Sequence, residues 1–156
     1  MKKGFKVIGF SLLGLLALML GYMVTQGVYP IWMSIHDKVY QVENDLAIGG
    51  MDPVTYFAGN PEMGNSNHSY RYKGASFQFA SAQNLEAFKA NPDNYMPKYG
   101  GYCAFATGSG VIAPSSAECY LVQEGELFLF SNKEVQIKFK ESFSDMKQKA
   151  DKAWKK

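Results

Sequence analysis

The sequence is poor in the side chains that most metalloenzymes and thiol enzymes use. Its 156 residues include two cysteines, Cys103 and Cys119, and two histidines, His36 and His68. The cysteines do not form the CxxC pair of thioredoxin-like proteins, and a structural zinc site needs four ligands, mostly Cys or His. A Ser-His-Asp pattern, a phosphate-binding glycine loop and a pair of acid–base carboxylates are also lacking. We therefore expect no enzymatic activity.

A strong charge of one sign is lacking as well. The formal net charge is +2, but three of the lysines, Lys2, Lys3 and Lys6, precede an apolar segment. Without them the chain has 13 basic and 14 acidic residues, so the rest of the chain is nearly neutral. Proteins that bind nucleic acid need a strongly basic face, so we expect no nucleic-acid partner. No internal repeat or low-complexity segment is evident, and the remaining length is typical of one domain.

The single long apolar run lies near the N-terminus. Residues 7–24 read VIGFSLLGLLALMLGYMV, about the length that a helix needs to cross a bilayer. Because the lysines precede this run, we expect residues 1–26 to be a transmembrane anchor with a cytoplasmic N-terminus and an extracytoplasmic, periplasmic domain. The alternative is a cleaved signal peptide, whose apolar core is usually shorter, roughly 7–15 residues. Residues 27–44 are then a stalk, and residues 45–156 form the domain.

Two glycine-containing motifs are the most informative local features. Residues 48–57 read IGGMDPVTYF, and residues 99–104 read YGGYCA. We expect Asp52 to cap a short helix, because its carboxylate accepts free N–H groups and a proline at the first helical position has none. In the second motif the two glycines permit a sharp turn that brings Cys103 close to a bound group.

Together these motifs resemble the YHS-domain family, in its subgroup of small exported proteins with DPVxYF and GGYCA motifs. The resemblance extends from about Ala47 to about Trp154. It implies a small α+β, metal-associated module of a kind often attached to proteins that handle heavy metals. Residues 67–69 read NHS and retain part of the Tyr-His-Ser signature, whereas the cysteine pair of the metal-sensing members is absent.

The resemblance makes Cys103 the central candidate site residue. Its thiolate can bind a soft metal or act as a redox nucleophile, and His68 is the second candidate metal ligand. We expect Asp52, Tyr56 and Tyr102 to lie nearby as ligand-binding residues. Copper(I) suits so few ligands better than zinc does, because it accepts two or three soft donors.

For Cys103, His68 and Asp52, a purely structural role is the alternative to ligand binding. Cys103 is alternatively a core residue among aromatic rings, or the partner of Cys119 in a disulfide if the compartment is oxidising. His68 is alternatively a structural or exposed strand residue, and Asp52 only a helix cap.

Alternating aromatic residues predict two β-hairpins with two-residue Lys-Gly and Glu-Gly turns. The hairpin strands are residues 69–72 with 75–79, and residues 119–122 with 127–130. Ser81 is expected to cap a helix after the first hairpin, and a helix from about Asn132 closes the chain with apolar residues at helical spacing. The predicted fold class is α+β, a small antiparallel sheet of hairpins covered by helices.

These features predict one of two function classes. The first is a membrane-tethered, extracytoplasmic YHS-like module that binds a soft, copper-like metal ion or a small ligand. The alternative is a non-catalytic accessory or interaction subunit of a larger membrane complex. Both imply contact between lipid and the N-terminal helix, and the second implies a membrane-protein partner.

Overall fold

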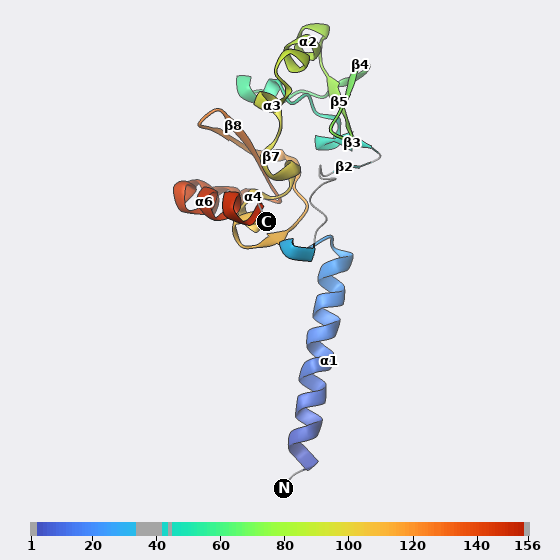
Figure 1. The fold of residues 1–156 in the computed structure, drawn as a ribbon, viewed down its shortest axis with the longest axis vertical. Helices are drawn as coiled ribbons and strands as arrows, with labels where there is room; N and C mark the ends of the chain where they lie inside the picture. The colour runs from blue at the N-terminus through green and yellow to red at the C-terminus, as the bar shows by residue number, and fades with distance from the viewer. Residues whose placement is uncertain (1–2, 34–41, 44, 155–156) are drawn as a thin grey trace.

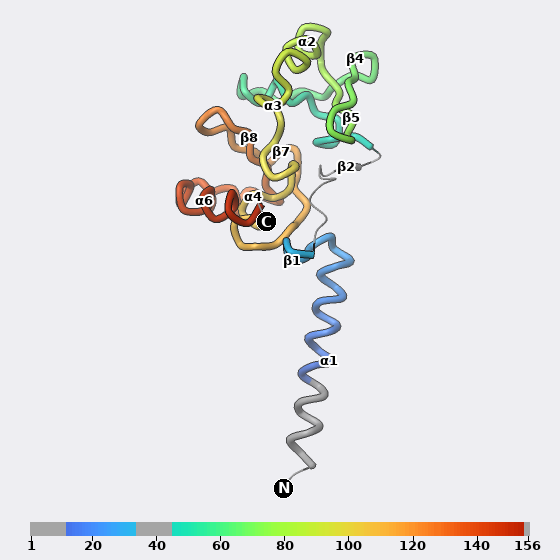
Figure 2. Tube along the Cα trace, in the orientation of Figure 1, coloured from blue at the N-terminus to red at the C-terminus, as the bar shows by residue number. Residues whose placement is uncertain are grey.

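The protein is an α+β fold at the end of a long N-terminal helix (Figures 1 and 2). The structure, a computed structural model, describes residues 3–33, 42–43 and 45–154. Helix α1 (Lys3–Thr25) projects away from the rest of the chain (Figure 1). Within the described part of the chain, no helix is both long enough and apolar enough to cross a membrane.

The segment after α1 is attached to the folded part. Strand β1 (Tyr29–Pro30) pairs antiparallel with β6 (Val111–Ile112), and Ile31, at the start of the short helix η1 (Ile31–Met33), is buried. The prediction assigned residues 27–44 to a stalk, but residues 29–31 belong to the fold. Residues 34–41 and 44 of that predicted stalk lie outside the described residues.

Both predicted hairpins are confirmed. Strand β4 (Asn65–Tyr72) pairs antiparallel with β5 (Ala75–Phe79), and β7 (Ser116–Gln123) pairs antiparallel with β8 (Glu126–Phe130). The first hairpin extends into a sheet of order β2-β3-β5-β4, with β2 (Val42–Glu43) and β3 (Leu46–Ala47). Because β3 runs parallel to β5, this sheet is mixed, whereas the prediction was purely antiparallel.

Short helices connect and cover the strands. They are η3 (Ile48–Gly50), η4 (Thr55–Ala58), α2 (Ala82–Ala90), α3 (Pro92–Tyr95), η5 (Lys98–Gly101), α4 (Ala104–Gly108), α5 (Lys133–Glu141) and α6 (Phe143–Trp154). The side chain of Ser81 accepts a hydrogen bond from the Asn84 N–H, which confirms it as the cap of α2. The closing helix is two helices and not one, because Ser142 (φ −120°, ψ 36°) leaves the helical conformation between α5 and α6.

Residues 46–96 (unit 1) and 97–147 (unit 2) are two copies of one structural unit, related by a shift of 51 residues without insertions. The hairpins have the same register, including the same irregularity: Asn65 pairs with Phe79 as Ser116 pairs with Phe130. The parallel pairing of Leu46 with Ser76 recurs as Pro97 with Leu127. The expectation that the chain contains no internal repeat was therefore wrong.

Backbone hydrogen bonds outside the strands repeat with the same shift. The Asp52 N–H donates to the Glu62 carbonyl at 2.9 Å, and the Cys103 N–H donates to the Ala113 carbonyl at 3.0 Å. The caps of α2 and α5, Ser81 and Asn132, are likewise 51 residues apart, and each accepts from the N–H three residues on. The two units therefore share local geometry as well as topology.

The identical residues of the two units are mainly glycine and phenylalanine. The pairs are Gly49 and Gly100, Gly50 and Gly101, Gly59 and Gly110, Gly74 and Gly125, Phe77 and Phe128, Phe79 and Phe130, and Phe88 and Phe139, together with Lys89 and Lys140. All eight glycines have positive φ, a conformation that other residues adopt only with strain, and all six phenylalanines are fully buried.

Each unit has its own aromatic core, and β8 lies between the two cores. Leu127 and Leu129 belong to the cluster that contains Phe77 and Phe88 of unit 1. The intervening side chains of β8 belong instead to the second cluster, around α5 and α6. Side chains alternate along a strand, so β8 is buried on both faces and joins the units.

Candidate functional site

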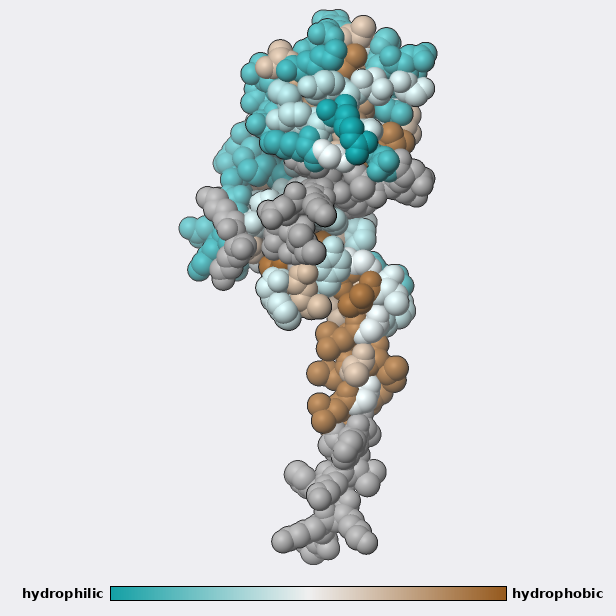
Figure 3. Space-filling view, turned by 45° about the vertical axis from the view of Figure 1, so that its right-hand side comes forward, coloured by the Kyte–Doolittle hydropathy of each residue, from teal (hydrophilic) through white to brown (hydrophobic). Residues whose placement is uncertain are grey.

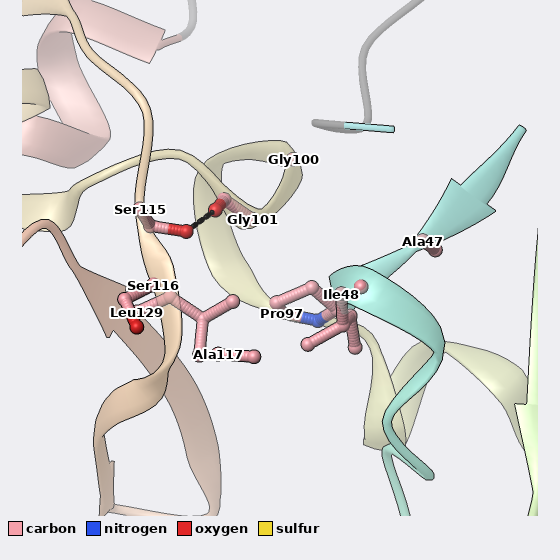
Figure 4. A pocket seen from close by; sticks show the side chains of 10 residues that line it. Ala47, Ile48, Pro97, Gly100, Gly101, Ser115, Ser116, Ala117 and Leu129 are labelled. Atoms are coloured by element: carbon pink, nitrogen blue, oxygen red, sulfur yellow. Dashed lines mark hydrogen bonds between the residues drawn. The ribbon is translucent and has the colours of Figure 1, made fainter. Parts of the chain in front are cut away.

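The two glycine motifs line the same cleft. Its volume is about 340 Å³, and its walls are residues 47–49 of unit 1 together with residues 97, 100–101, 115–117 and Leu129 of unit 2 (Figure 4). None of these described residues carries a charged side chain. The surface of the cleft is therefore made of glycine backbone, serine hydroxyls and small apolar side chains, which favours an uncharged ligand.

Each wall contains three consecutive residues in the left-handed conformation. The φ angles are 55°, 59° and 83° for residues 48–50, and 54°, 63° and 78° for residues 99–101. Left-handed backbone is strained for Ile48 and Tyr99, at a cost of about 1–3 kcal/mol each, but not for the glycines that follow. A Cβ added to Gly49 would meet no atom within 4 Å, so this glycine is required by conformation and leaves open space above it.

The equivalent place in unit 1 has a close backbone contact. The Gly64 N–H donates to the Gly50 carbonyl at 2.9 Å, and a Cβ added to Gly64 would overlap the backbone carbon of Gln78. Unit 2 has Ser115 at this position, and its hydroxyl donates to the Gly101 carbonyl at 2.5 Å (Figure 4). Gly64 thus makes a closer backbone contact than a residue with a side chain could, and in unit 2 a serine hydroxyl reaches the Gly-Gly turn instead.

Asp52 is fully buried in a closed network of hydrogen bonds. Its Oδ1 accepts from the Val54 N–H at 2.9 Å, and its Oδ2 accepts from the Ala80 N–H at 2.8 Å and from Asn84 Nδ2 at 2.7 Å. The helix η4 begins only at Thr55, and Asp52 makes no side-chain bond to that helix itself. The predicted cap is thus a turn-forming residue that also ties the first motif to α2, and it does not line the cleft.

Tyr56 supports the cleft wall from behind. Its hydroxyl donates to the Ala117 carbonyl at 2.7 Å, and its ring packs edge-on against Tyr120 at 4.9 Å. Burial raises the pKa of Tyr56, and the neighbouring Tyr120 and Glu118 raise it further. This tyrosine therefore stays neutral and fixes the position of Ala117.

Tyr102 and Tyr99 connect the second motif to other elements. Burial, with a smaller contribution from Tyr29 of β1, raises the pKa of Tyr102 to about 12, and its ring lies 6.5 Å from that of Trp154. The Tyr99 hydroxyl donates to Asp151 Oδ1 of α6 at 3.0 Å. Burial raises the pKa of Asp151, but hydrogen bonds from Lys147 and Tyr99 outweigh it and hold this pKa below its usual range.

The two cysteines are free thiols on opposite edges of β8. Cys103 pairs with Leu129 from one side, and Cys119 lies just before Tyr120, which pairs with Leu129 from the other side. Two strand spacings amount to roughly 9–10 Å between Cα atoms, whereas a disulfide needs at most about 7 Å. The fold therefore excludes the Cys103–Cys119 disulfide without backbone movement.

The predicted metal ligands are not brought together. Cys103 is buried and lies at the start of α4, with its Sγ 3.7 Å from Ser131 Oγ, whereas His68 is half-buried in β4, the outer strand of the first sheet. Figure 1 shows β4 and α4 at opposite ends of the folded part. Among the described residues, no group of three or more His, Cys, Asp or Glu side chains is placed to hold a metal ion.

The repeat relates the candidate residues to one another. Cys103 is the counterpart of Asp52, and Cys119 is the counterpart of His68, each 51 residues further along the chain. The sequence predictions missed the wall formed by residues 115–117. The constant spacing of the Gly-Gly pairs and of the phenylalanines was the signal that could have revealed the repeat, and with it this wall.

The chain matches no protein-family model, no curated protein and no solved structure.

Proposed function

We propose that this protein is a membrane-tethered, non-catalytic binding module of the YHS type, whose cleft between the two Gly-Gly turns holds an uncharged ligand. The observation that carries this proposal is the convergence of both motifs on one cleft. Both motifs place a glycine at positive φ in the wall of this cleft, Gly49 and Gly100.

The membrane tether is supported by the surface of α1 (Figure 3). Large apolar side chains are exposed on several sides of this helix: Leu12, Leu13, Leu15, Leu16, Leu18, Met19, Leu20, Tyr22 and Val24. Burying each such side chain in an apolar environment is worth about 1.5–3 kcal/mol. We propose that lipid supplies this environment, with the lysines before the run on the cytoplasmic side and the domain outside.

An alkaline wash of isolated membranes tests the tether. We expect the full chain to stay with the lipid, and the double variant Leu16→Lys, Leu18→Lys to be released, because two charges in the apolar run oppose insertion. Release of the unsubstituted protein would contradict the tether.

A soft-metal function has less support than an uncharged ligand. Cys103 is closed off in the core, and His68 lies in another sheet. The accessory-subunit function fits the cleft equally well if the bound group belongs to a partner protein, so the ligand proposal includes this class.

Amide NMR of the full chain in detergent micelles tests the cleft. We expect members of a library of uncharged fragments to shift the resonances of Gly49, Gly100 and Ser116, and the variant Ser116→Phe to abolish these shifts by filling the cleft. The matched control is Asn65→Phe at the equivalent position of unit 1. The two variants lose the same local bond, since Asn65 accepts from the N–H two residues on as Ser116 does.

The proposal fails if no fragment shifts the cleft resonances, or if Ser116→Phe leaves the shifts unchanged. Copper(I) is a separate arm of the same titration. Copper-induced shifts centred on Cys103, without any fragment-induced shift at the cleft, would favour the metal-binding function instead.

A further inference from the structure

We propose that the folded domain makes a second contact with the bilayer through the short helix η1, where Trp32 and Met33 lie in the lipid interface beside the end of α1. This contact rests on the membrane tether of the proposed function and goes beyond it, because the domain itself then lies against the lipid. It follows from how α1 joins the fold and from what is exposed at that joint.

Helix α1 joins the folded part without a flexible linker. The Gly27 N–H donates to the Val24 carbonyl at 3.0 Å. The Val28 N–H donates to the Met23 carbonyl at 2.9 Å. With Gly27 at a φ of 70°, these two bonds form the Schellman motif that ends many helices. Strand β1 begins at the residue after Val28, so the chain passes directly from the end of the helix into the fold.

Unit 2 holds this joint in place. A Cβ added to Gly27 would lie 3.2 Å from Pro114 Cγ, so the end of α1 is tightly packed against unit 2. Beyond the pairing of β1 with β6, the Ile31 N–H donates to the Gly110 carbonyl at 3.0 Å, and the Ile31 side chain is buried. Helix η1 is therefore fixed beside the end of α1 (Figure 1).

The other two side chains of η1 are exposed. Trp32 exposes 78% of its surface and Met33 exposes 54%, and within the described part of the chain Trp32 is the most exposed large apolar side chain. Single exposed apolar side chains are common on protein surfaces. These two, however, continue the apolar surface of α1, whose last turn also exposes Tyr22 and Val24. The apolar surface that needs covering thus extends from α1 onto the domain.

The length of α1 places η1 at the surface of the bilayer. At 1.5 Å per residue, residues 7–24 span roughly 27 Å, which is close to the roughly 30 Å thickness of the hydrocarbon core. The helix ends at Thr25, so η1 lies where the headgroups begin. Tryptophan is favoured at this depth, because its ring is apolar and its N–H can hydrogen-bond to water and headgroups. Lipid is therefore the occupant that fits η1.

The second contact fixes how the domain presents its cleft. Ser115 of the cleft wall directly follows Pro114, which packs against Gly27 at the end of α1. A single spanning helix can tilt in the bilayer, whereas a helix and an adjacent interfacial contact together restrict the tilt. The cleft therefore keeps one orientation relative to the membrane surface.

Quenching of tryptophan fluorescence tests the contact on the full chain in phosphatidylcholine vesicles. The chain has two tryptophans, so Trp154→Phe leaves Trp32 as the reporter, and Trp32→Phe leaves Trp154. The Trp154 ring packs against Tyr99 and Tyr102, with centroids 6.0 and 6.5 Å apart. We expect lipid brominated in the upper part of its acyl chains to quench Trp32 at least threefold more strongly than Trp154.

A charge next to Trp32 should withdraw η1 from the lipid. In the Trp32 reporter we expect Met33→Asp to lower quenching by brominated lipid at least twofold, because a carboxylate is costly to bury in lipid. The matched control is Met63→Asp, which changes an exposed methionine of unit 1 and should leave the quenching unchanged. Both positions are exposed, so neither substitution disturbs the core.

Flotation of the vesicles separates this contact from the tether. If the chain floats with the vesicles but aqueous iodide quenches Trp32 and brominated lipid does not, the second contact is wrong and the tether stands. If the chain does not float, both are wrong. Equal quenching of the two tryptophans, or equal effects of Met33→Asp and Met63→Asp, would also overturn the second contact.

Discussion

Replacing Asp52 tests whether the first motif is primarily a structural connection. In the native protein its buried carboxylate accepts three hydrogen bonds, from Val54, Ala80 and Asn84, at 2.7–2.9 Å. The variant Asp52→Ala leaves these donors without their acceptor. Two of them belong to segments 28 and 32 residues away, so the loss separates the motif from β5 and α2.

The expected destabilisation is about 3–5 kcal/mol. Each buried donor left without a partner costs about 1–3 kcal/mol, and the carboxylate's own desolvation penalty offsets part of the total. A small domain has only about 5–15 kcal/mol of stability, so the variant should be marginally folded. The variant Asp52→Asn keeps the shape but points an NH₂ group at a donor, and we expect a loss of about 2 kcal/mol.

Urea unfolding of the full chain in micelles, followed by near-ultraviolet circular dichroism, measures these losses. The matched control is Cys103→Ala at the equivalent position of unit 2, where the buried thiol packs in the core and makes a long contact to Ser131 Oγ. Its small cavity should cost about 1–2 kcal/mol. A loss below about 1 kcal/mol for Asp52→Ala, or one no larger than that of Cys103→Ala, would refute the structural role.

Three further measurements probe the repeat, the thiols and the response to acid. In urea unfolding, Gly64→Ala should lower the free energy of unfolding by at least about 1–3 kcal/mol, because its Cβ overlaps the neighbouring strand. In Gly59→Ala the added Cβ meets open space, so this variant should lose only the roughly 1 kcal/mol that a left-handed backbone costs alanine. Equal losses would contradict the close strand contact at Gly64. A thiol reagent should label half-buried Cys119 in the native protein and buried Cys103 only on unfolding, and a total below two free thiols after unfolding would contradict the reduced state. The lowered pKa of Asp151 stabilises the fold above the ordinary carboxyl pKa, near 4, so stability should fall as the pH drops below that value, and Asp151→Asn should remove part of this acid dependence.

The sequence alone determined the features that depend on neighbouring residues. The two hairpins follow from alternating aromatic residues around Lys-Gly and Glu-Gly turns, and both formed in the predicted positions. The helix cap at Ser81 needs only the N–H three residues on. These elements could be predicted because propensity, capping and turn chemistry act within a few residues.

The repeat was hidden because a fold needs few identical residues. Glycines at positive φ and phenylalanines in the core keep their identity between the units, whereas other positions vary with their local contacts. Asp52 and Cys103 occupy equivalent positions of the two units but differ in chemistry. The amino-acid identities of the two motifs therefore do not reveal that the motifs are equivalent.

Only the tertiary structure decided the site. The cleft is formed where unit 2 packs against the turn of unit 1, through residues as distant as Ile48 and Leu129. One wall carries Ser115, whose hydroxyl donates to the Gly101 carbonyl, where unit 1 has the closely packed Gly64. Likewise, Cys103 and His68 are separated because they lie in different units on different sheets. Such outcomes depend on steric contacts between segments far apart in the chain, and local sequence patterns do not encode those distances.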